Sequence, residues 1–391
     1  MSESEDDEPA RLQNVEPSSE PEAPVYVTRP ELPPLEDFLP YLEQIWATKV
    51  LSNNGPFHQQ LEQELQQRWD VPYVSLFSNG TLALVTALQA LPLEGEVITT
   101  PFTFAATAHA ISWNRLTPVF ADIDPVTLNL DPGSAQEMIS DKTAAILPVH
   151  TYGRPADVEG FAKLGQAHDL PVIYDAAHCF DVDYRGVSVL SWGDLSAVSF
   201  HATKVFNTFE GGALISHSPE MKRRIDQLKN FGFVDEATIV AAGINGKMSE
   251  FNAALGLVQL ERIDHDLASR RSIDAHYRKG LADVKGIVCH SYDLNQTANY
   301  GYFPIRVTDE YPLSRDDLYY ALAKSGVHAR RYFYPLLTDT EPYRAMELSS
   351  SGTPMAQSVA EQIICLPIYA SISTASISRT IDVLRTCRRI H

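Results

Sequence analysis

Short apolar runs alternate with amphipathic stretches along the middle of the chain. Apolar residues recur at helical spacing over 34–46, 57–68, 81–91 and 157–167. Seven apolar runs are typical of strands: Tyr73–Phe77, Glu96–Thr99, Thr117–Ala121, Ala144–Val149, Pro171–Asp175, Ala197–Phe200 and Gly212–Ser216. This alternation predicts an α/β fold, in which a mostly parallel seven-stranded sheet lies between helices.

The pattern changes after the last of these strands. One long helix is expected from about Ser249 through Tyr277, and beyond residue 280 strands and helices mix again. We therefore expect three parts: an acidic tail without structure over 1–24, a large domain over 25–270 and a small C-terminal α/β domain over 271–391.

Charge, cysteine content and hydropathy argue against nucleic-acid binding, a metal site and membrane association. The chain has 391 residues and a net charge of -19, of which about -7 falls in the first 24 residues, so broad binding to nucleic acid is not expected. The four cysteines are scattered without a CxxC pair, and no metal site is expected. Neither a secretory signal nor an apolar run of about 18 residues is present, so we expect no membrane association and a cytoplasmic location.

Polar residues directly after the predicted strands are the candidates for chemistry, because ligands of open α/β sheets bind at the carboxyl ends of the strands. The turn Ser78-Asn79-Gly80-Thr81 precedes a helix and can cradle a phosphate, although an ordinary helix cap is the commoner role of such a turn. Phe104 follows the strand that ends near Thr99, and either covers a ring or packs in the core.

Asp175 ends an apolar strand, and Lys204 follows another. The carboxylate of Asp175 can either pair with a protonated ring nitrogen of a cofactor or cap a helix. Lysine is usually a solvated surface residue, but an amine held at a strand end can lose its proton and attack an aldehyde.

With these pieces in order, the chain resembles the sugar aminotransferases of the DegT/DnrJ/EryC1/StrS family, which have fold type I of the pyridoxal-phosphate enzymes. The resemblance extends from about Val25 to the C-terminus. Its motifs are Asn53-Asn54-Gly55-Pro56, Asn79-Gly80-Thr81, Thr103-Phe104, Asp175-Ala176-Ala177, Ser199-Phe200-His201-Ala202-Thr203-Lys204, Asn245 with Lys247-Met248, Glu250 and Tyr334-Pro335.

The resemblance implies a role for each matching residue. Lys204 would bind the aldehyde of pyridoxal phosphate and move protons, and Asp175 would bind the pyridine nitrogen. The phosphate would be held by Ser199 with the backbone of Gly80, Thr81 and Leu82, and Phe104 would stack on the ring. Asn245 would reach the phosphate of a neighbouring subunit in a homodimer. His178 stands where many members have Gln, and can still contact the 3-hydroxyl of the cofactor.

The resemblance also implies the reaction. Relatives that dehydrate sugars carry His at the position of Lys204, so the lysine favours transamination, with glutamate as the amino donor and a nucleotide-linked keto sugar as acceptor. We expect dTDP-4-dehydro-6-deoxyglucose as the acceptor; amination at C3, a UDP or GDP sugar, and a ligand-binding regulator remain alternatives. Candidate substrate residues are Lys247, His328, Arg330, Arg331, Tyr332 and Tyr334, whose basic members could equally be surface charges.

Overall fold

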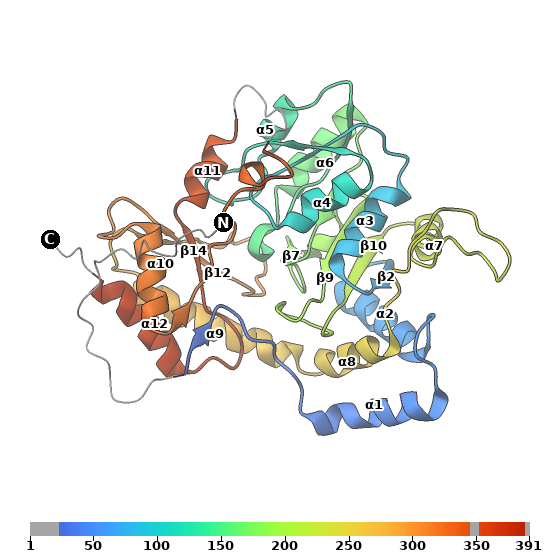
Figure 1. Cartoon of the computed structure of the whole chain (residues 1–391), viewed down its shortest axis with the longest axis horizontal. Helices are drawn as coiled ribbons and strands as arrows, with labels where there is room; N and C mark the ends of the chain where they lie inside the picture. Colours follow the sequence, from blue (N-terminus) through green and yellow to red (C-terminus); the bar gives the residue numbers. More distant parts are fainter. Residues whose placement is uncertain (1–22, 345–351, 388–391) are drawn as a thin grey trace, which may run out of the picture.

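The computed structural model describes residues 23–344 and 352–387, so residues 1–22 of the predicted acidic tail lie outside the described part (Figure 1). The helices are α1 (Leu35–Thr48), α2 (Pro56–Trp69), α3 (Gly80–Ala90), α4 (Ala105–Trp113), α5 (Pro132–Glu137), α6 (Val158–His168), α7 (Pro219–Leu228), α8 (Glu250–Leu260), α9 (Ile263–Leu281), α10 (Arg315–Lys324), α11 (Pro354–Ala360) and α12 (Thr374–Thr386). The strands are β1 (Val25–Tyr26), β2 (Tyr73–Phe77), β3 (Glu96–Thr99), β4 (Thr117–Phe120), β5 (Thr143–Ile146), β6 (Ile173–Asp175), β7 (Asp183–Tyr184), β8 (Val187–Ser188), β9 (Leu195–Ser199), β10 (Gly212–Ser216), β11 (Ile287–Cys289), β12 (Phe303–Val307), β13 (Val327–His328) and β14 (Ile363–Leu366).

All seven predicted strands are present, and together they form one continuous sheet. Two groups, β2-β10-β9-β6 and β4-β3-β5, meet through the parallel bridges Ile146 to Val172 and Val149 to Asp175. Only β10 runs antiparallel to its neighbours. The prediction of a mostly parallel seven-stranded sheet in an α/β fold is therefore confirmed.

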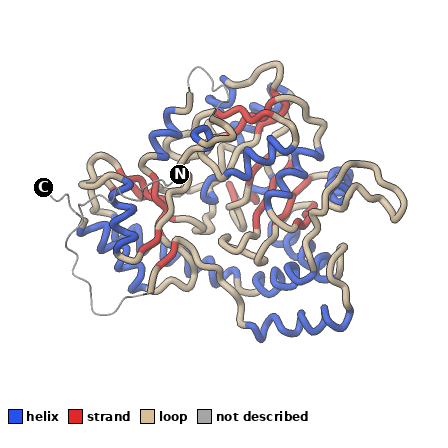
Figure 2. Tube along the Cα trace, viewed as in Figure 1, coloured by secondary structure: helices blue, strands red, loops and turns tan. Residues whose placement is uncertain are grey.

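Helices cover both faces of this sheet because successive strand residues point to opposite sides (Figures 1 and 2). Val74 and Leu76 of β2 pack into a core with α2, α6 and α8, while Phe77 packs into a second core with α3, α4 and α7. Leu214 of β10 likewise lies in the second core. The strands are thus buried on both faces, which explains their continuous apolar runs.

The prediction of a single long helix from about Ser249 is wrong, because the helix is interrupted. The structure has two helices there, α8 and α9, separated at Glu261 and Arg262. The amide of Arg262 donates to the carbonyl of Gln259, and the amide of His265 donates to the carbonyl of Arg262, which are the tighter bonds of a 3₁₀ turn. Apolar periodicity continues through such a turn, so the sequence pattern did not reveal the break.

The C-terminal part has its own sheet and core. Strands β11, β12 and β14 pair antiparallel, and Tyr277 of α9 packs with residues of α10 and α12 over them. The first described strand, β1, pairs in parallel with β13, and Val25 lies in this C-terminal core. The first described residues of the chain therefore complete the C-terminal core. Among the described helices, none has the length and apolarity to cross a membrane.

Candidate active site

The turn between β2 and α3 lies against the end of β9. Ser199 of β9 and Phe77 of β2 both pair with Gly212 of β10, which brings the two strand ends level. A Cβ atom added to Gly80 would lie 2.8 Å from the Cβ of Ser199, so only glycine allows this approach. The first amide groups of α3 lack intrahelical acceptors, and together with the Ser199 hydroxyl they form a cradle suited to a phosphate.

One of the three amides predicted for this cradle is already engaged. The amide of Leu82 donates to Asn79 Oδ1 at 2.9 Å, which is a helix cap. Gly80 and Thr81 occupy the first two positions of α3, where the amides point out of the helix. The turn therefore works both as a cap and as a candidate anion site, and the two alternatives raised by its sequence are compatible.

Asp175 ends β6 as a buried carboxylate with two donors. Its Oδ2 accepts from the Thr107 hydroxyl at 2.7 Å and its Oδ1 accepts from the amide of Ala177 at 3.1 Å. Burial raises the pKa of Asp175, while Thr107, Ala177 and the ammonium of Lys204 act in the opposite direction. A buried carboxylate held in this way is suited to a protonated ring nitrogen.

Thr107 was not given a role by the sequence. It lies in the first turns of α4, and its hydroxyl also bonds to the Thr103 hydroxyl at 2.9 Å. Both threonines come shortly after the end of β3, at the edge of the sheet where ligands bind, and that is the signal that could have indicated them.

Lys204 lies just beyond the end of β9, partly buried, on the same edge as Asp175. Its Nζ donates to the Tyr302 hydroxyl at 3.1 Å. Burial lowers the pKa of Lys204 to about 8, although Asp175 and Tyr332 favour the charged form. Near neutral pH the unprotonated amine is therefore more abundant than in a solvated lysine, and the unprotonated amine is the form that attacks an aldehyde.

His178 presents a neutral ring beside Lys204. Its Nδ1 accepts from the amide of Tyr152 at 3.1 Å, which places the remaining ring proton on Nε2. Burial, and then the nearby Lys204 ammonium, hold the pKa of His178 well below its usual value. The ring stacks parallel to Phe333, with centroids 6.2 Å apart. A neutral Nε2–H donor fits the predicted contact with a hydroxyl on the cofactor ring.

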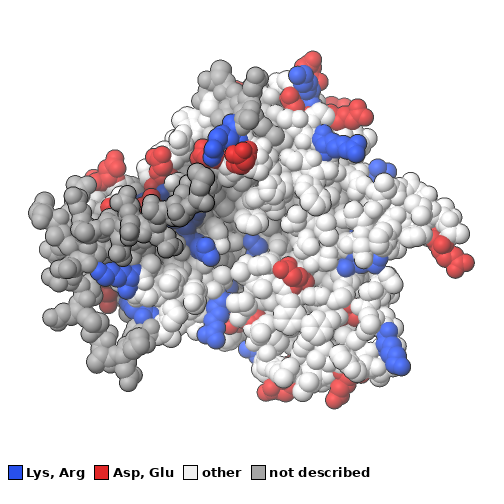
Figure 3. Space-filling view, viewed as in Figure 1, with Lys and Arg blue, Asp and Glu red and all other residues white. Residues whose placement is uncertain are grey.

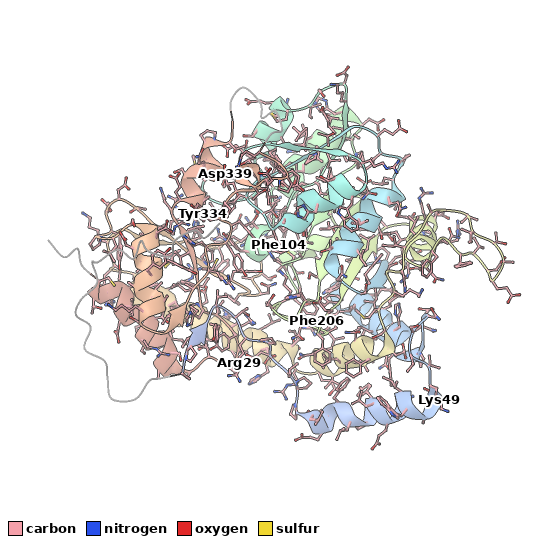
Figure 4. All side chains as sticks on the ribbon, in the orientation of Figure 1. Arg29, Lys49, Phe104, Phe206, Tyr334 and Asp339 are labelled. Carbon is pink, nitrogen blue, oxygen red and sulfur yellow. The ribbon has the colours of Figure 1, made fainter. Side chains whose placement is uncertain are left out.

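Phe104 precedes α4, near the middle of the molecule (Figure 4). Phe104 is 62% exposed, which is unusual for phenylalanine. In the part of the chain that the structure describes, Phe104 is therefore not a core residue, which was the alternative reading of its sequence position. An uncovered ring at this edge of the sheet is available to stack on a flat ligand.

Asn245 and Lys247 lie on a segment that runs beside the phosphate turn of their own chain. The amide of Ser78 donates to the carbonyl of Gly246 at 2.8 Å, and Phe77 is bridged to Lys247. The Lys247 ammonium donates to Asn230 at 2.7 Å, and Asn245 itself is exposed. This exposure leaves the Asn245 side chain available to a neighbouring subunit.

The other predicted substrate residues lie at different depths. Tyr332 is close enough to Lys204 to influence its protonation, and its carbonyl accepts from the Tyr152 hydroxyl. The guanidinium of Arg331 is paired with Asp316 at 2.8 Å and lies over the ring of Tyr334.

His328 and Arg330 are both exposed; His328 ends β13, which pairs with β1, and Arg330 lies two residues beyond it. The ring of His328 stacks on Tyr26 at 5.0 Å, and the backbone of Arg330 pairs with that of Cys365. Of the six predicted substrate residues, Tyr332 is therefore the one that the structure brings to Lys204, and the charge of the exposed Arg330 acts on Tyr332.

The chain matches the model of the DegT/DnrJ/EryC1/StrS aminotransferase family over residues 35–385. It is 50% identical over 364 residues to a dTDP-4-amino-4,6-dideoxy-D-glucose transaminase of Shigella dysenteriae, covering 93% of this chain and 99% of that relative. It is 30% identical to a GDP-perosamine synthase of Caulobacter vibrioides, covering 88% and 93%. A crystal structure of DesI in the presence of its TDP-sugar product superposes with a TM-score of 0.90 at 35% identity, covering 94% of this chain and 93% of that one.

Proposed function

Because the chain belongs to the DegT/DnrJ/EryC1/StrS aminotransferase family, we propose that it transfers an amino group from glutamate to C4 of dTDP-4-dehydro-6-deoxyglucose. The product would be dTDP-4-amino-4,6-dideoxyglucose. The chain is an aminotransferase that uses pyridoxal phosphate. The observation that carries the proposal is the partly buried Lys204 amine on the same sheet edge as the buried carboxylate of Asp175.

The residues present fit pyridoxal phosphate. The cradle at Gly80 would be filled by any Cβ atom, and Asp175 is a buried carboxylate with donors on both oxygens. When bound, the cofactor supplies an aldehyde for the amine and a ring that withdraws electrons. Asp175 would keep a proton on the ring nitrogen, and the turn with Ser199 would hold the phosphate.

Lys204 would carry out the proton transfers of the reaction. Its neutral nitrogen would take a proton from the α carbon of the amino donor and would give that proton up again later in the transfer, so the amine ends each transfer unchanged. His178 would donate from Nε2 to the ring hydroxyl of the ligand and orient it. Phe104 and the aromatic side chains around Lys204 exclude water from the site.

A homodimer is part of this proposal. The face drawn in Figure 3 has a large area without charge over the large domain. Leu35, Leu51, Phe104 and Trp113 are large apolar residues that are each more than half exposed. Trp113 also lines a hollow of about 460 Å³ beside the phosphate turn, with Thr81 and His109. A second copy of the chain would cover this surface and bring Asn245 to the turn.

The four cysteines are unpaired in the described chain, which supports the proposed cytoplasmic location, where thiols stay reduced.

The first experiment tests the acceptor. The purified protein is incubated with pyridoxal phosphate, glutamate and a panel of dTDP, UDP and GDP keto sugars, and the products are identified by mass spectrometry and NMR. We expect one product, aminated at C4 of the dTDP sugar. Amination of a UDP or GDP sugar, or at C3, with the dTDP sugar unchanged, would refute the acceptor but not the aminotransferase activity.

The second experiment tests the amine. Lys204→Ala should reduce turnover by more than about a thousandfold, because the variant lacks both the nucleophile and the proton carrier. Lys163→Ala changes an exposed lysine on α6 and should keep the activity of the unchanged protein. A Lys204→Ala variant that turns over at the rate of the Lys163→Ala control would show that the role of Lys204 is wrong.

A further inference from the structure

The hydroxyl of Tyr302 is a partner of Lys204 that does not come from the large sheet. Tyr302 directly precedes β12 in the C-terminal part of the chain, yet its hydroxyl accepts from Lys204 Nζ at 3.1 Å. The contact therefore joins two residues that are 98 positions apart. No strand end or motif indicated Tyr302, and its place beside the amine comes from the fold.

The loop that carries Tyr302 is fixed to the strand that carries Asp175. The buried amide group of Asn299 donates to the carbonyls of His178 and Phe180, each at 2.8 Å, and its Oδ1 accepts from the amide of Gly301 at 3.1 Å. These bonds set the position of Tyr302 relative to the residues that follow β6. The Asn299 side chain thus fixes the loop that precedes Tyr302 to the segment that follows β6.

The ring of Tyr302 is enclosed by aromatic neighbours. Ring centroids lie 4.6 Å away at His178, 5.5 Å away at Tyr152 and 6.1 Å away at Tyr332. Burial raises the pKa of Tyr302 above its usual value, so the hydroxyl keeps its proton. A protonated hydroxyl can accept from an ammonium and can donate to a neutral amine, so it suits both states of Lys204.

On the basis of the proposed function, we propose that Tyr302 is the positioning residue for Lys204. Its hydroxyl holds the amine at the reacting edge of the site whenever that amine is not bonded to another group. Lys204 takes the proton from the donor carbon and gives it up again, while Tyr302 gains and loses no net proton. The aromatic neighbours of Tyr302 keep the hydroxyl in place between the two transfers.

The first test uses the full chain without cofactor. Limiting acetic anhydride is reacted with the protein between pH 6 and 10, and acetylation of Lys204 and of the exposed Lys163 is measured by mass spectrometry. Tyr302→Phe removes a hydrogen bond that is stronger to the charged ammonium than to the neutral amine, so we expect the apparent pKa of Lys204 to fall by about 0.5 to 1 unit. Lys163 is the internal reference and should not change.

The matched control is Tyr300→Phe, the same chemical change two positions earlier, where the ring packs on Tyr292. Its Lys204 titration should equal that of the unchanged protein. A titration in Tyr302→Phe equal to that of Tyr300→Phe would overturn the proposal. This measurement needs neither donor nor sugar, so its result is independent of the proposed reaction.

The second test follows the loaded protein during its reaction with glutamate alone. Stopped-flow absorbance should show the half-reaction of Tyr302→Phe slowed about tenfold, the size expected for one hydrogen bond to a charged group, with a larger isotope effect from α-deuterated glutamate. Tyr302→His, which retains a ring and a polar atom, should recover part of the rate. A half-reaction of Tyr302→Phe as fast as that of the unchanged protein would show that the ring acts only by packing, because phenylalanine keeps the ring, and would overturn the proposal.

The two proposals fail in different ways. Absence of any reaction of the unchanged protein with glutamate refutes the amino donor, whereas the acetylation experiment still decides the role of Tyr302. Melting temperatures of the variants are recorded first, and the Tyr302→His titration decides the question if Tyr302→Phe does not fold.

Discussion

At the scale of single residues, the site depends on side chains that hold other side chains. Asp175 is the clearest case, because its burial alone would favour the neutral acid, and the Thr107 hydroxyl supports the charged form. The carboxylate is useful to a protonated ring nitrogen only while it is charged. Thr107 therefore acts on the cofactor through Asp175.

This predicts the effect of removing the Thr107 hydroxyl. Thr107→Val keeps the shape of the side chain but removes the donor, so the pKa of Asp175 should rise further and pyridoxal phosphate should bind about tenfold more weakly. Thr107→Ser restores a hydroxyl and should bind the cofactor nearly as the unchanged protein does. Titration of each variant with pyridoxal phosphate, followed by absorbance, measures the difference. Equal affinities of the Val and Ser variants would contradict the assignment.

At the scale of elements, one buried carboxylate from α8 holds the start of α2. Glu250, the first residue of α8, accepts from the amides of Phe57 at 2.9 Å and His58 at 2.8 Å, in the first turn of α2. A Cβ atom on Gly55 would lie 2.5 Å from Glu250 Cδ, so the loop before α2 approaches this carboxylate closely. Glu250 thus caps a helix that is far from it in sequence.

We expect Glu250→Ala to lower the free energy of unfolding by about 2 to 4 kcal/mol, because two buried amides lose their acceptor at a helix start. Glu250→Gln keeps one acceptor oxygen and should lose less. Urea unfolding followed by circular dichroism measures both. Glu64→Ala, a change at an exposed residue of α2, is the control, and a loss in Glu250→Ala no larger than in this control would show that the cap is not needed.

At the scale of the whole molecule, a buried ionic network joins elements that are distant along the chain. Glu62 of α2 accepts from the amide of Leu76 in β2 at 3.0 Å, and pairs with Lys222 of α7 at 3.1 Å and with Lys229 at 3.3 Å. The carbonyl of Lys229 in turn accepts from the amide of Gly246, next to the phosphate turn. The network therefore supports the back of the candidate cradle.

The pH dependence of stability follows from this network. Burial alone would raise the pKa of Glu62, but Lys229, His58 and Lys222 outweigh it and hold the pKa well below its usual 4.5. A lowered pKa in the folded state stabilises the fold at pH values above 4.5, and this stabilisation is lost as the pH falls below that value.

Glu62→Gln tests this expectation. At pH 7 the variant should be less stable by about 2 kcal/mol, because the buried Lys229 loses one of its two carboxylate partners and keeps only Asp226 at 3.0 Å, and the difference should shrink as the pH is lowered from 5 to 3. Urea unfolding at each pH gives the values. Glu64→Gln, on the exposed side of the same helix, should show little difference at any pH. A Glu62→Gln difference that stays constant down to pH 3 would contradict the lowered pKa.

The residue pattern alone determined the parts of the fold that depend on neighbours in the chain. Apolar runs and helical spacing predicted all seven strands of the large sheet, because a strand that is buried on both faces needs apolar residues throughout. The positions of Gly80, Asp175 and Lys204 after strands followed from the same pattern, since parallel strands deliver their carboxyl ends to related edges of a sheet. The family resemblance then gave these positions their roles.

The tertiary structure alone decided which distant residues meet. Periodicity holds no information on contacts such as Tyr302 with Lys204, Thr107 with Asp175 or Glu250 with the start of α2. It also did not reveal that β1 returns to β13, or that the helix after Ser249 is interrupted. These features arise when folding brings segments together that are separated by dozens to hundreds of residues, where burial and hydrogen bonding, rather than local preference, choose the partners.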